Sequence, residues 1–550
     1  MSSTNQPLLH TPHKTTTNCK ILFITISIST LLISAVLLLP NLTNKSSHNY
    51  LSNPSSLCLR ASNPQACQDF VSEVVSDEEI PLETTTLFRK ILIKQAHHMN
   101  RAILQTRKLK SQINAHNEEG ALADCLELID LSIDLVFDSI KALGKNQTSK
   151  SNANAQAWLS GVLTNHVSCL DGLNSVARKS LGAVLEELIS RAKASLGILA
   201  AISEQDVEMT QPLRGKLPSW ITAFDRKLMQ SRADAIKADI VVAKDGSGNY
   251  KTVAEAIAAA PNKSKTRFVI HVKKGTYKEN VEVGKSKRNV MIIGDGMDAT
   301  ILTGDLNVVD GSTTFRSATL AAVGEGVILQ DIWIQNTAGP EKHQAVALRV
   351  GADKSVINRC RIDAYQDTLY AHSLRQFYRD CYITGTVDFI FGNAAVVFQK
   401  CNLVPRKPMQ SQKNMVTAQG RTDPNQSTGT SIQDCEIKAS SDLEAVKSSF
   451  PTYLGRPWKE YSRTVVMQSY IGDVIEPAGW SEWSGDFALK TLYYGEYMNR
   501  GPGAGTSKRV KWPGYHIITS AAEAMKFTVR ELIQGGEWLG STGVAYTEGL

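Results

Sequence analysis

Residues 364–370 read AYQDTLY, and residues 385–392 read GTVDFIFG. Each stretch places one acid, Asp367 or Asp388, among aromatic and branched side chains, and the two acids are 21 residues apart. Short strand-like runs recur around them, and in four of these runs a cysteine stands two places before an aliphatic residue: Cys360, Cys381, Cys401 and Cys435. Successive cysteines are separated by 21, 20 and 34 residues. An imperfect repeat of this length, made of short strands, is typical of a parallel β-solenoid.

In a parallel solenoid, residues one repeat apart lie on adjacent strands, about 4.8 Å from each other. Gln344, Gln366 and Asp388 follow one another at intervals of 22 residues, and Asp367 precedes Asp388 by 21. The two amides and the two carboxyl groups are therefore predicted to line up across three coils on one outer face.

Two carboxyl groups about 5 Å apart disfavour simultaneous ionisation, so one of them tends to keep its proton. Such a pair offers a nucleophile or base beside an acid, and the amides could supply oxyanion hydrogen bonds worth roughly 2.7–4 kcal/mol each. The alternative is a set of buried structural acids with a stacked glutamine ladder. Residues 454–458 (LGRPW) add Arg456, which can hold a carboxylate bidentately, and Trp458, which can pack on a sugar ring. The alternative there is a turn with a core tryptophan.

The chain of 550 residues exceeds the usual size of one hydrophobic core, so two or three domains are expected. The formal net charge is +7, a mild excess that suits either an acidic polymer as substrate or an ordinary solvated surface. Lysines and arginines are scattered and no zinc-finger or RNP-type signature occurs, which argues against nucleic acid as a partner. No cysteine pair has the close spacing of a zinc site, so no metal is expected.

Residues 21–39 form an uncharged run that is long enough, at about 1.5 Å per residue, to span a bilayer core. Lys14 and Lys20 precede it, which favours a cytosolic tail over residues 1–20 and a lumenal remainder. We predict a transmembrane signal anchor or a signal peptide at 21–39, followed by a linker over 40–54. The precursor would enter the secretory pathway anchored to the membrane by this single helix. Sequons agree with that route and predict glycosylation of five residues: Asn41, Asn44, Asn146, Asn262 and Asn425.

Residues 55–205 carry apolar side chains at spacings of three and four, as in Leu126, Ile129 and Ile133. Proline is scarce and strand-like runs are absent, so an all-α antiparallel helical bundle is predicted. Two disulfides could tie it together, one in an N-terminal hairpin and one between two helices: Cys58 with Cys67, and Cys125 with Cys169. No reactive constellation is visible in this segment, which indicates a binding or regulatory module.

Residues 206–235 break the helical periodicity and carry two basic clusters, RGKL at 214–217 and RKLM at 226–229. Basic residues in an exposed linker suit subtilisin-like processing proteases, and a plain polar linker is the alternative. We predict a processing linker whose two tetrads are bounded by Arg214, Leu217, Arg226 and Met229. After it, over residues 236–550, composition shifts toward Val, Ile, Thr, Gly and aromatics, and an all-β solenoid is predicted.

Two parts of the chain resemble known families. AWLSGVLTN at 157–165 and CLDG at 169–172, with four cysteines in the order given above, resemble the plant invertase and pectin methylesterase inhibitor domain. Residues 236–550 resemble the catalytic domain of plant pectin methylesterases through five motifs: DGSTTF at 310–315, QNTAGP at 335–340, YQDTLY at 365–370, GTVDFIFG at 385–392 and LGRPW at 454–458. The resemblances imply a four-helix bundle for the first part and a right-handed parallel β-helix for the second.

The second resemblance also implies roles for individual residues. Asp388 resembles the nucleophile that attacks the methyl-ester carbonyl of a galacturonosyl unit. Asp367 resembles the acid that protonates departing methanol and then serves as base for the hydrolytic water. Gln366 and Gln344 resemble oxyanion stabilisers, and Arg456 matches the residue that positions the nucleophile and contacts substrate. The remaining matches are two substrate-contacting positions and the family's disulfide: Thr314, Trp458, and Cys381 with Cys401.

The resemblance implies hydrolysis of the methyl esters of homogalacturonan in the plant cell wall, with no cofactor. It also implies two protein partners, a subtilisin-like processing protease and pectinesterase inhibitor proteins. The full-length protein is expected to be latent, with the helical bundle covering the groove. Two other functions stay open: a pectin-backbone glycoside hydrolase, whose adjacent-Asp and Gly-His-Gly signatures are missing, and a non-catalytic wall-binding or inhibitor protein. A serine esterase is disfavoured because no Gly-x-Ser-x-Gly sequence occurs.

Overall fold

The computed structural model describes residues 54–76, 83–112, 116–144, 148–205 and 237–550, which belong to one compact unit. Several predictions fall outside these ranges: the apolar run at 21–39, the sequons at Asn41, Asn44 and Asn146, and the tetrads at 214–217 and 226–229. Within the described ranges, no helix is both long enough and apolar enough to cross a membrane.

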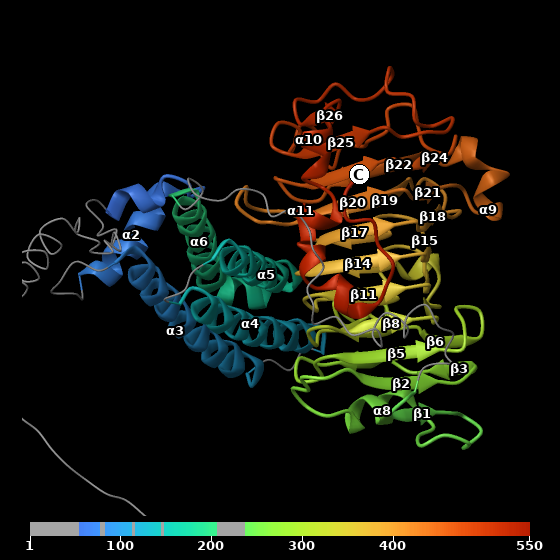
Figure 1. The fold of residues 1–550 in the computed structure, drawn as a ribbon, viewed down its shortest axis with the longest axis horizontal. Coiled ribbons are helices and arrows are strands. Elements are labelled where there is room, and N and C mark those ends of the chain that lie inside the picture. Colours follow the sequence, from blue (N-terminus) through green and yellow to red (C-terminus); the bar gives the residue numbers. More distant parts are fainter. Residues whose placement is uncertain (1–53, 77–82, 113–115, 145–147, 206–236) are drawn as a thin grey trace, which may run out of the picture. The chain divides into compact units, whose positions relative to one another are not determined.

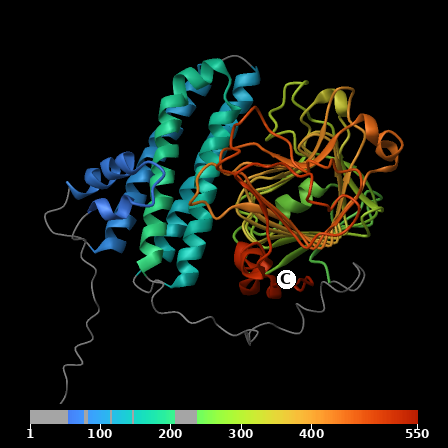
Figure 2. The same ribbon diagram turned by 90° about the horizontal axis from the view of Figure 1, so that it is seen from above.

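The first part of the described chain is all-α (Figure 1). It consists of one 3-10 helix and five α-helices: η1 (Pro54–Cys58), α2 (Pro64–Val75), α3 (Thr84–Lys110), α4 (His116–Ala142), α5 (Ser149–Gly172) and α6 (Ser175–Gln205). The four long helices form a closed ring of neighbours, because α3 packs on α4, α4 on α5, α5 on α6 and α6 on α3. Figure 2 shows α5 and α6 side by side. This is the four-helix bundle that the sequence predicted.

Local contacts explain where these helices begin and how they are tied. The Asn63 side chain accepts a hydrogen bond from the Ala66 amide, and Pro64 occupies the first helical position, where a missing N–H costs nothing. Thr148 and Ser151 form a reciprocal capping pair at the start of α5. Both disulfides predicted for the bundle are present, and the second joins α4 to α5: Cys58–Cys67 and Cys125–Cys169.

Residues 237–550 wind through three sheets in which every strand pair is parallel. The first sheet has 11 strands, in the order β1 (Ile240–Val242), β2 (Phe268–Val272), β5 (Val290–Gly294), β8 (Ile328–Gln330), β11 (Ser355–Asn358), β14 (Arg375–Arg379), β17 (Ala395–Gln399), β20 (Gly429–Gln433), β23 (Arg463–Met467), β25 (Tyr493–Tyr497) and β26 (Tyr515–Ile517). The second has 7, in the order β22 (Thr452–Pro457), β19 (Asn414–Gln419), β16 (Ile390–Gly392), β13 (Leu369–Ala371), β10 (Leu348–Val350), β7 (Leu320–Ala322) and β4 (Val281–Val283). The third has 8, in the order β24 (Tyr470–Ile471), β21 (Glu436–Ile437), β18 (Asn402–Pro405), β15 (Tyr382–Gly385), β12 (Arg361–Asp363), β9 (Trp333–Asn336), β6 (Thr300–Gly304) and β3 (Gly275–Lys278).

Successive strands of each sheet come from successive coils, so the predicted solenoid is confirmed as a parallel β-helix. Figure 1 shows the strands of the first sheet as stacked rungs, and Figure 2 looks along the stack. Short helices decorate it: α8 (Val253–Ala259), η4 (Pro340–Lys342), α9 (Ser441–Glu444), η5 (Lys447–Ser449), α10 (Ala521–Met525), α11 (Val529–Ile533), η6 (Gly535–Glu537) and η7 (Leu539–Thr542). Helix α8 contributes Val253, Ala256 and Ile257 to the interior of the coil. Helix α11 packs on β17 from outside.

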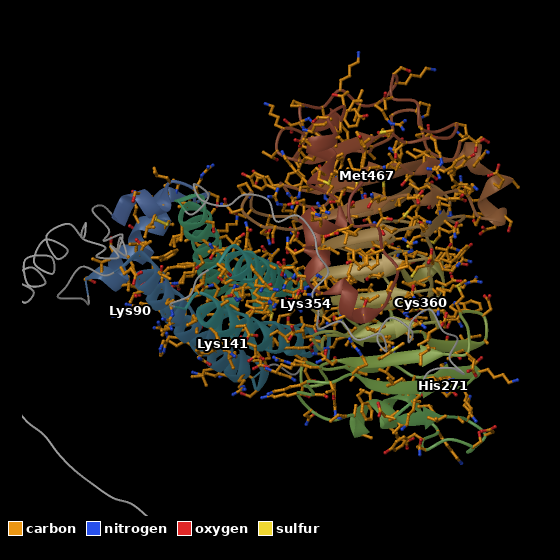
Figure 3. The ribbon with its side chains drawn as sticks, in the orientation of Figure 1. Lys90, Lys141, His271, Lys354, Cys360 and Met467 are labelled. Carbon is orange, nitrogen blue, oxygen red and sulfur yellow. A yellow bond between two sulfur atoms is a disulfide. The ribbon has the colours of Figure 1, made fainter. Side chains whose placement is uncertain are left out.

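The four cysteines of the repeat form the predicted ladder along the interior. Strand pairing aligns the residues that follow them, Arg361 with Tyr382, Tyr382 with Asn402 and Asn402 with Glu436, so the cysteines are in register too. All four are buried, and Cys360 is labelled in Figure 3.

The predicted disulfide between Cys381 and Cys401 is wrong, because both cysteines are free thiols. In-register side chains on parallel strands point the same way, so their Cβ atoms lie about 4.8 Å apart, farther than the roughly 3.8 Å typical of a disulfide. Each thiol instead donates to a backbone carbonyl: Cys381 Sγ lies 3.3 Å from Arg379 O, and Cys401 Sγ lies 3.4 Å from Gln399 O. The repeat that places the two residues side by side also keeps their sulfur atoms from bonding.

Candidate active site

Asp367 and Asp388 occupy equivalent positions on adjacent coils. Strand pairing aligns Leu369 with Ile390, and each aspartate lies two residues before its strand residue. Both have a left-handed backbone, with φ of 64° and 53°. Aspartate tolerates this conformation better than most residues, and a non-glycine residue held there at a cleft is a mark of function. The predicted stacking of the two acids is confirmed.

The two glutamines do not stack in the same register. Because Leu348 of β10 aligns with Leu369 of β13, the residue opposite Gln366 is Ala345 rather than Gln344. The interval of 22 residues therefore displaces each glutamine by one position from its predicted neighbour. Part of the prediction, an exact ladder of four polar groups, is wrong.

The glutamines nevertheless open onto the same space as the aspartates. A cavity of about 700 Å³ brings together all seven residues predicted to act in catalysis or substrate binding: Thr314, Gln344, Gln366, Asp367, Asp388, Arg456 and Trp458. They come from four separate stretches of sequence, which the coils place on one face. Toward the residues that the structure describes, the side-chain amides of Gln344 and Gln366 make no hydrogen bond, so both remain available to a ligand.

Arg456 lies on β22 and forms a bidentate ion pair with Asp388. Its Nε atom donates to Asp388 Oδ1 at 2.9 Å, and its Nη2 atom donates to Asp388 Oδ2 at 2.7 Å. Burial raises the pKa of Asp388, which is 6% exposed, while the Arg456 guanidinium lowers it. The bidentate geometry fits a charged carboxylate, because a guanidinium matches two anionic oxygens.

Asp367 is in a different electrostatic position although it is buried to the same degree, at 7% exposed. Burial raises its pKa well above the ordinary value, and the charge of Asp388 raises it further, with only a weaker opposing effect from Arg456. The geometry therefore favours a protonated Asp367 beside an ionised Asp388, which is the division of roles that an acid and a nucleophile need.

Aromatic side chains line the cavity around the acids. The rings of Tyr370 and Phe391, in register on β13 and β16, stack with centroids 4.2 Å apart. Trp458 meets the edge of Phe391 at 6.0 Å, and the Arg456 guanidinium lies 4.3 Å from the centre of the Trp483 ring. Flat apolar faces of this kind suit sugar rings.

Sequence reasoning missed four of the aromatic lining residues and one cation. Phe315, Tyr370 and Phe391 lie inside motifs quoted above, and the interval of 21 residues between the last two was a usable signal. Trp483 and Lys459 lie in irregular segments where no repeat gave a signal.

The helical bundle reaches the same cavity. Residues of α4 and α5 complete its lining: Asp124, Leu128, Ser168, Asp171 and Gly172. Asp171 Oδ2 lies 2.7 Å from Lys459 Nζ, next to Trp458. Ser168 Oγ lies 3.0 Å from His372 Nε2. The C-terminal end of α5 is thus fixed beside the acids.

Two further groups of polar contacts join the bundle to the β-helix. Asp124 of α4 accepts a hydrogen bond from Thr313 Oγ1 at 2.5 Å and pairs with Arg316 Nε at 2.5 Å. Burial raises the pKa of Asp124 to about 6, against the opposing effects of Arg316 and Thr313. On α5, Trp158 Nε1 donates to the buried Asp353 at 3.0 Å.

In the described part of the chain, no group of three or more His, Cys, Asp or Glu side chains is placed to hold a metal ion. The chemistry derived below uses only the residues named above.

Comparison with known proteins agrees with this geometry. The pectinesterase family model matches residues 239–536, and the model described as plant invertase/pectin methylesterase inhibitor matches residues 52–200. The chain is 63% identical to Pectinesterase 1 of Solanum lycopersicum, over the full length of both. It is 52% identical to Pectinesterase/pectinesterase inhibitor 18 of Arabidopsis thaliana, again over the full length of both.

A solved structure matches the β-helix. The pectin methylesterase from carrot has 63% sequence identity and a TM-score of 0.57, and the match covers 57% of this chain and 99% of that one. The chain therefore belongs to the plant pectinesterases, with a pectinesterase β-helix that follows an N-terminal domain of the pectin methylesterase inhibitor family.

Proposed function

The protein is a pectinesterase with activity on the methyl esters of pectin. We propose that Asp388 is its nucleophile and Asp367 its acid and base. A carboxylate oxygen of Asp388 attacks the carbonyl carbon of a methyl galacturonate ester, and the negative charge moves to the carbonyl oxygen. Gln344 and Gln366, whose amides face the same cavity, donate hydrogen bonds to that oxygen.

Collapse of this tetrahedral species breaks the bond to the methoxy oxygen. Asp367 gives its proton to that oxygen, methanol leaves, and the galacturonosyl carbonyl remains bonded to Asp388 as an anhydride. Asp367, now a carboxylate, takes a proton from water, and the resulting hydroxide attacks the anhydride carbonyl. This step releases galacturonate and restores the Asp388 carboxylate and the protonated Asp367.

One observation carries the assignment: Asp388 holds the guanidinium of Arg456 at two oxygens, whereas burial and the neighbouring charge favour the proton on Asp367. The family assignment favours ester hydrolysis over both a pectin-backbone glycosidase and a non-catalytic wall protein. The test is to incubate highly methylated homogalacturonan with the full chain after linker cleavage. We expect methanol release without new reducing ends, and no methanol from Asp388→Ala. Reducing ends that appear with the methanol would contradict the proposal.

We also propose that the bundle keeps the precursor latent until the linker over 206–235 is cut. The support is that α4 and α5 line the cavity that holds both acids. A subtilisin-like protease acting on RGKL at 214–217 or RKLM at 226–229 would release the enzyme into the cell wall. The run at 21–39 would hold the precursor on the membrane until then, and inhibitor proteins would bind the uncovered groove. Equal specific activity before and after linker cleavage would contradict latency.

A further inference from the structure

The loop between β19 and β20 carries the sequon at Asn425, Gln426 and Ser427. This loop is one of the contacts between the β-helix and the bundle. Asn425 Nδ2 donates to the backbone oxygen of Arg60 at 2.9 Å, and Gln156 Nε2 of α5 donates to the backbone oxygen of Asn425 at 3.1 Å.

The other two residues of the sequon contact α5 as well. Gln426 Nε2 donates to the backbone oxygen of Ser160 at 3.1 Å, and the Ser427 amide donates to Ser160 Oγ at 3.1 Å. All three residues of the sequon are therefore engaged by the bundle, two of them by the side chain.

The same loop is joined to the candidate active site. It starts at Gly420, where an added Cβ atom would lie only 2.8 Å from Cε3 of Trp458. Just before it, Gln419 Nε2 donates to Asn393 Oδ1, and Asn393 Nδ2 donates to Thr164 of α5. A change in how the bundle meets this loop therefore acts within one residue contact of the cavity.

N-glycosylation uses the nitrogen atom that makes the contact with Arg60. An oligosaccharide is transferred from a lipid-linked diphosphate donor: the bond from its first sugar carbon to the diphosphate oxygen breaks, a bond from that carbon to Asn425 Nδ2 forms, and Nδ2 loses one proton. A bulky sugar then stands where Nδ2 now lies 2.9 Å from a backbone oxygen of the bundle. The hydrogen bond to Arg60 and its neighbours cannot all survive this substitution.

The sequon at Asn262 provides an internal comparison. Asn262 is exposed, and its Oδ1 atom accepts a hydrogen bond from Ser286 of the β-helix itself. A glycan at that position would leave the described contacts of the bundle untouched.

We propose that Asn425 is glycosylated and that its glycan loosens the bundle from the β-helix, so that occupancy of this one sequon sets how readily the bundle leaves the cavity after the linker is cut. The proposal rests on the latency described under "Proposed function", but its test measures retention of the bundle and needs no esterase assay. Loss of one or two hydrogen bonds corresponds to about tenfold faster dissociation.

Two substitutions at Ser427 separate the glycan from the contacts. Ser427→Ala destroys the sequon and keeps the Asn425 side chain and the Ser427 amide, which make the contacts with the bundle. Ser427→Thr keeps the sequon and is the matched control. Asn262→Gln removes a glycan that has no contact with the bundle.

The full-length chain and the three variants are secreted from a host that glycosylates, and mass spectrometry measures occupancy at Asn425. After the linker is cut, size-exclusion chromatography over time measures how much bundle stays with the β-helix. We expect occupied Asn425 and fast loss of the bundle in the wild type, Ser427→Thr and Asn262→Gln, and about tenfold slower loss in Ser427→Ala. An unoccupied Asn425 in the wild type, or equal retention in Ser427→Ala and Ser427→Thr, would overturn the proposal. Circular dichroism of both Ser427 variants checks that each is folded.

Discussion

In the helical bundle, the residues that share a face are three and four places apart in the sequence, whereas in the β-helix the residues that meet are about 21 places apart. The bundle's pattern therefore reports only on a helix's own buried stripe. The pattern of the β-helix reports on contacts between separate coils, including the contact between Asp367 and Asp388. The same kind of periodicity thus predicts a scaffold in one region and a reactive pair in the other.

The two regions also treat buried acids differently. Asp388 in the β-helix has a bidentate partner from its own domain, so its environment persists when the bundle leaves. Asp124 in the bundle is buried against residues of the β-helix, so its environment exists only while the two are in contact. Catalytic electrostatics belong to one region alone, and the electrostatics of latency belong to the pair.

The largest effect that separates the regions is expected from Asp388→Asn. Loss of the nucleophile should lower kcat for methanol release by at least about 10⁴-fold. Binding of the bundle should change little, because Asp388 contacts Arg456 rather than α4 or α5 in the described structure. Asp434→Asn, an exposed acid on the far side of the repeat turn, is the control and should keep full activity. A residual rate within 100-fold of wild type would contradict the role of Asp388.

Asp367→Asn should lower the rate of methanol release by about 10²- to 10⁴-fold, as loss of a general acid does. Its effect on stability has the opposite sign. The pKa of Asp367 is raised in the folded protein, so ionisation costs stability as pH rises above the ordinary carboxyl pKa. The variant should therefore melt at a higher temperature than wild type at pH 7, and the difference should vanish below about pH 4. Thermal melts across this pH range measure it, and a lower melting temperature at pH 7 would contradict the assignment.

Asp124 should make the bundle bind more tightly as pH falls. Its pKa is raised to about 6 in contact with the β-helix, so the bound state takes up a proton that the free bundle does not hold at pH 5. Linkage then gives about tenfold slower release of the cut bundle at pH 5 than at pH 7. Asp124→Asn should lose this part of the pH dependence. A pH profile unchanged by the substitution would show that other groups control release.

The smallest effect is expected at the ion pair between Lys459 and Asp171. Both side chains are partly exposed, so the pair is worth about 0.5–1 kcal/mol, or a two- to fivefold change in the release of the cut bundle. Lys459→Met, Asp171→Asn and the double variant form a cycle that isolates the pair. If the two single effects simply add in the double variant, the contact contributes nothing.

The sequence predicted the β-helix, the bundle, two disulfides and the stacking of Asp367 on Asp388 because each depends on a repeat or a spacing. It failed where one residue of spacing mattered. The interval between Gln344 and Gln366 differs from that of the strands by one, which moved them out of register. It also failed for Cys381 and Cys401, because adjacency on parallel strands brings Cα atoms close without turning the side chains toward each other.

Contacts between the two regions lay beyond the sequence altogether. Lys459 and Asp171 are nearly 300 residues apart, and nothing in either segment marks the other as its partner. Such pairs depend on how two finished surfaces fit, and no periodicity encodes that fit. Trp483 illustrates the same limit within the β-helix, because it lies in an irregular segment outside the strands.

The left-handed backbone at Asp367 and Asp388 limits which mutations each position can accept, apart from any chemistry. Asparagine and glycine adopt this conformation readily, whereas β-branched residues do so at a high conformational cost. A mutational scan read out only by the yield of folded, secreted protein should therefore still favour Asp, Asn and Gly at both positions and reject Val and Ile. Any effort to evolve a new activity in this groove would begin with only a few usable residues at its two central positions.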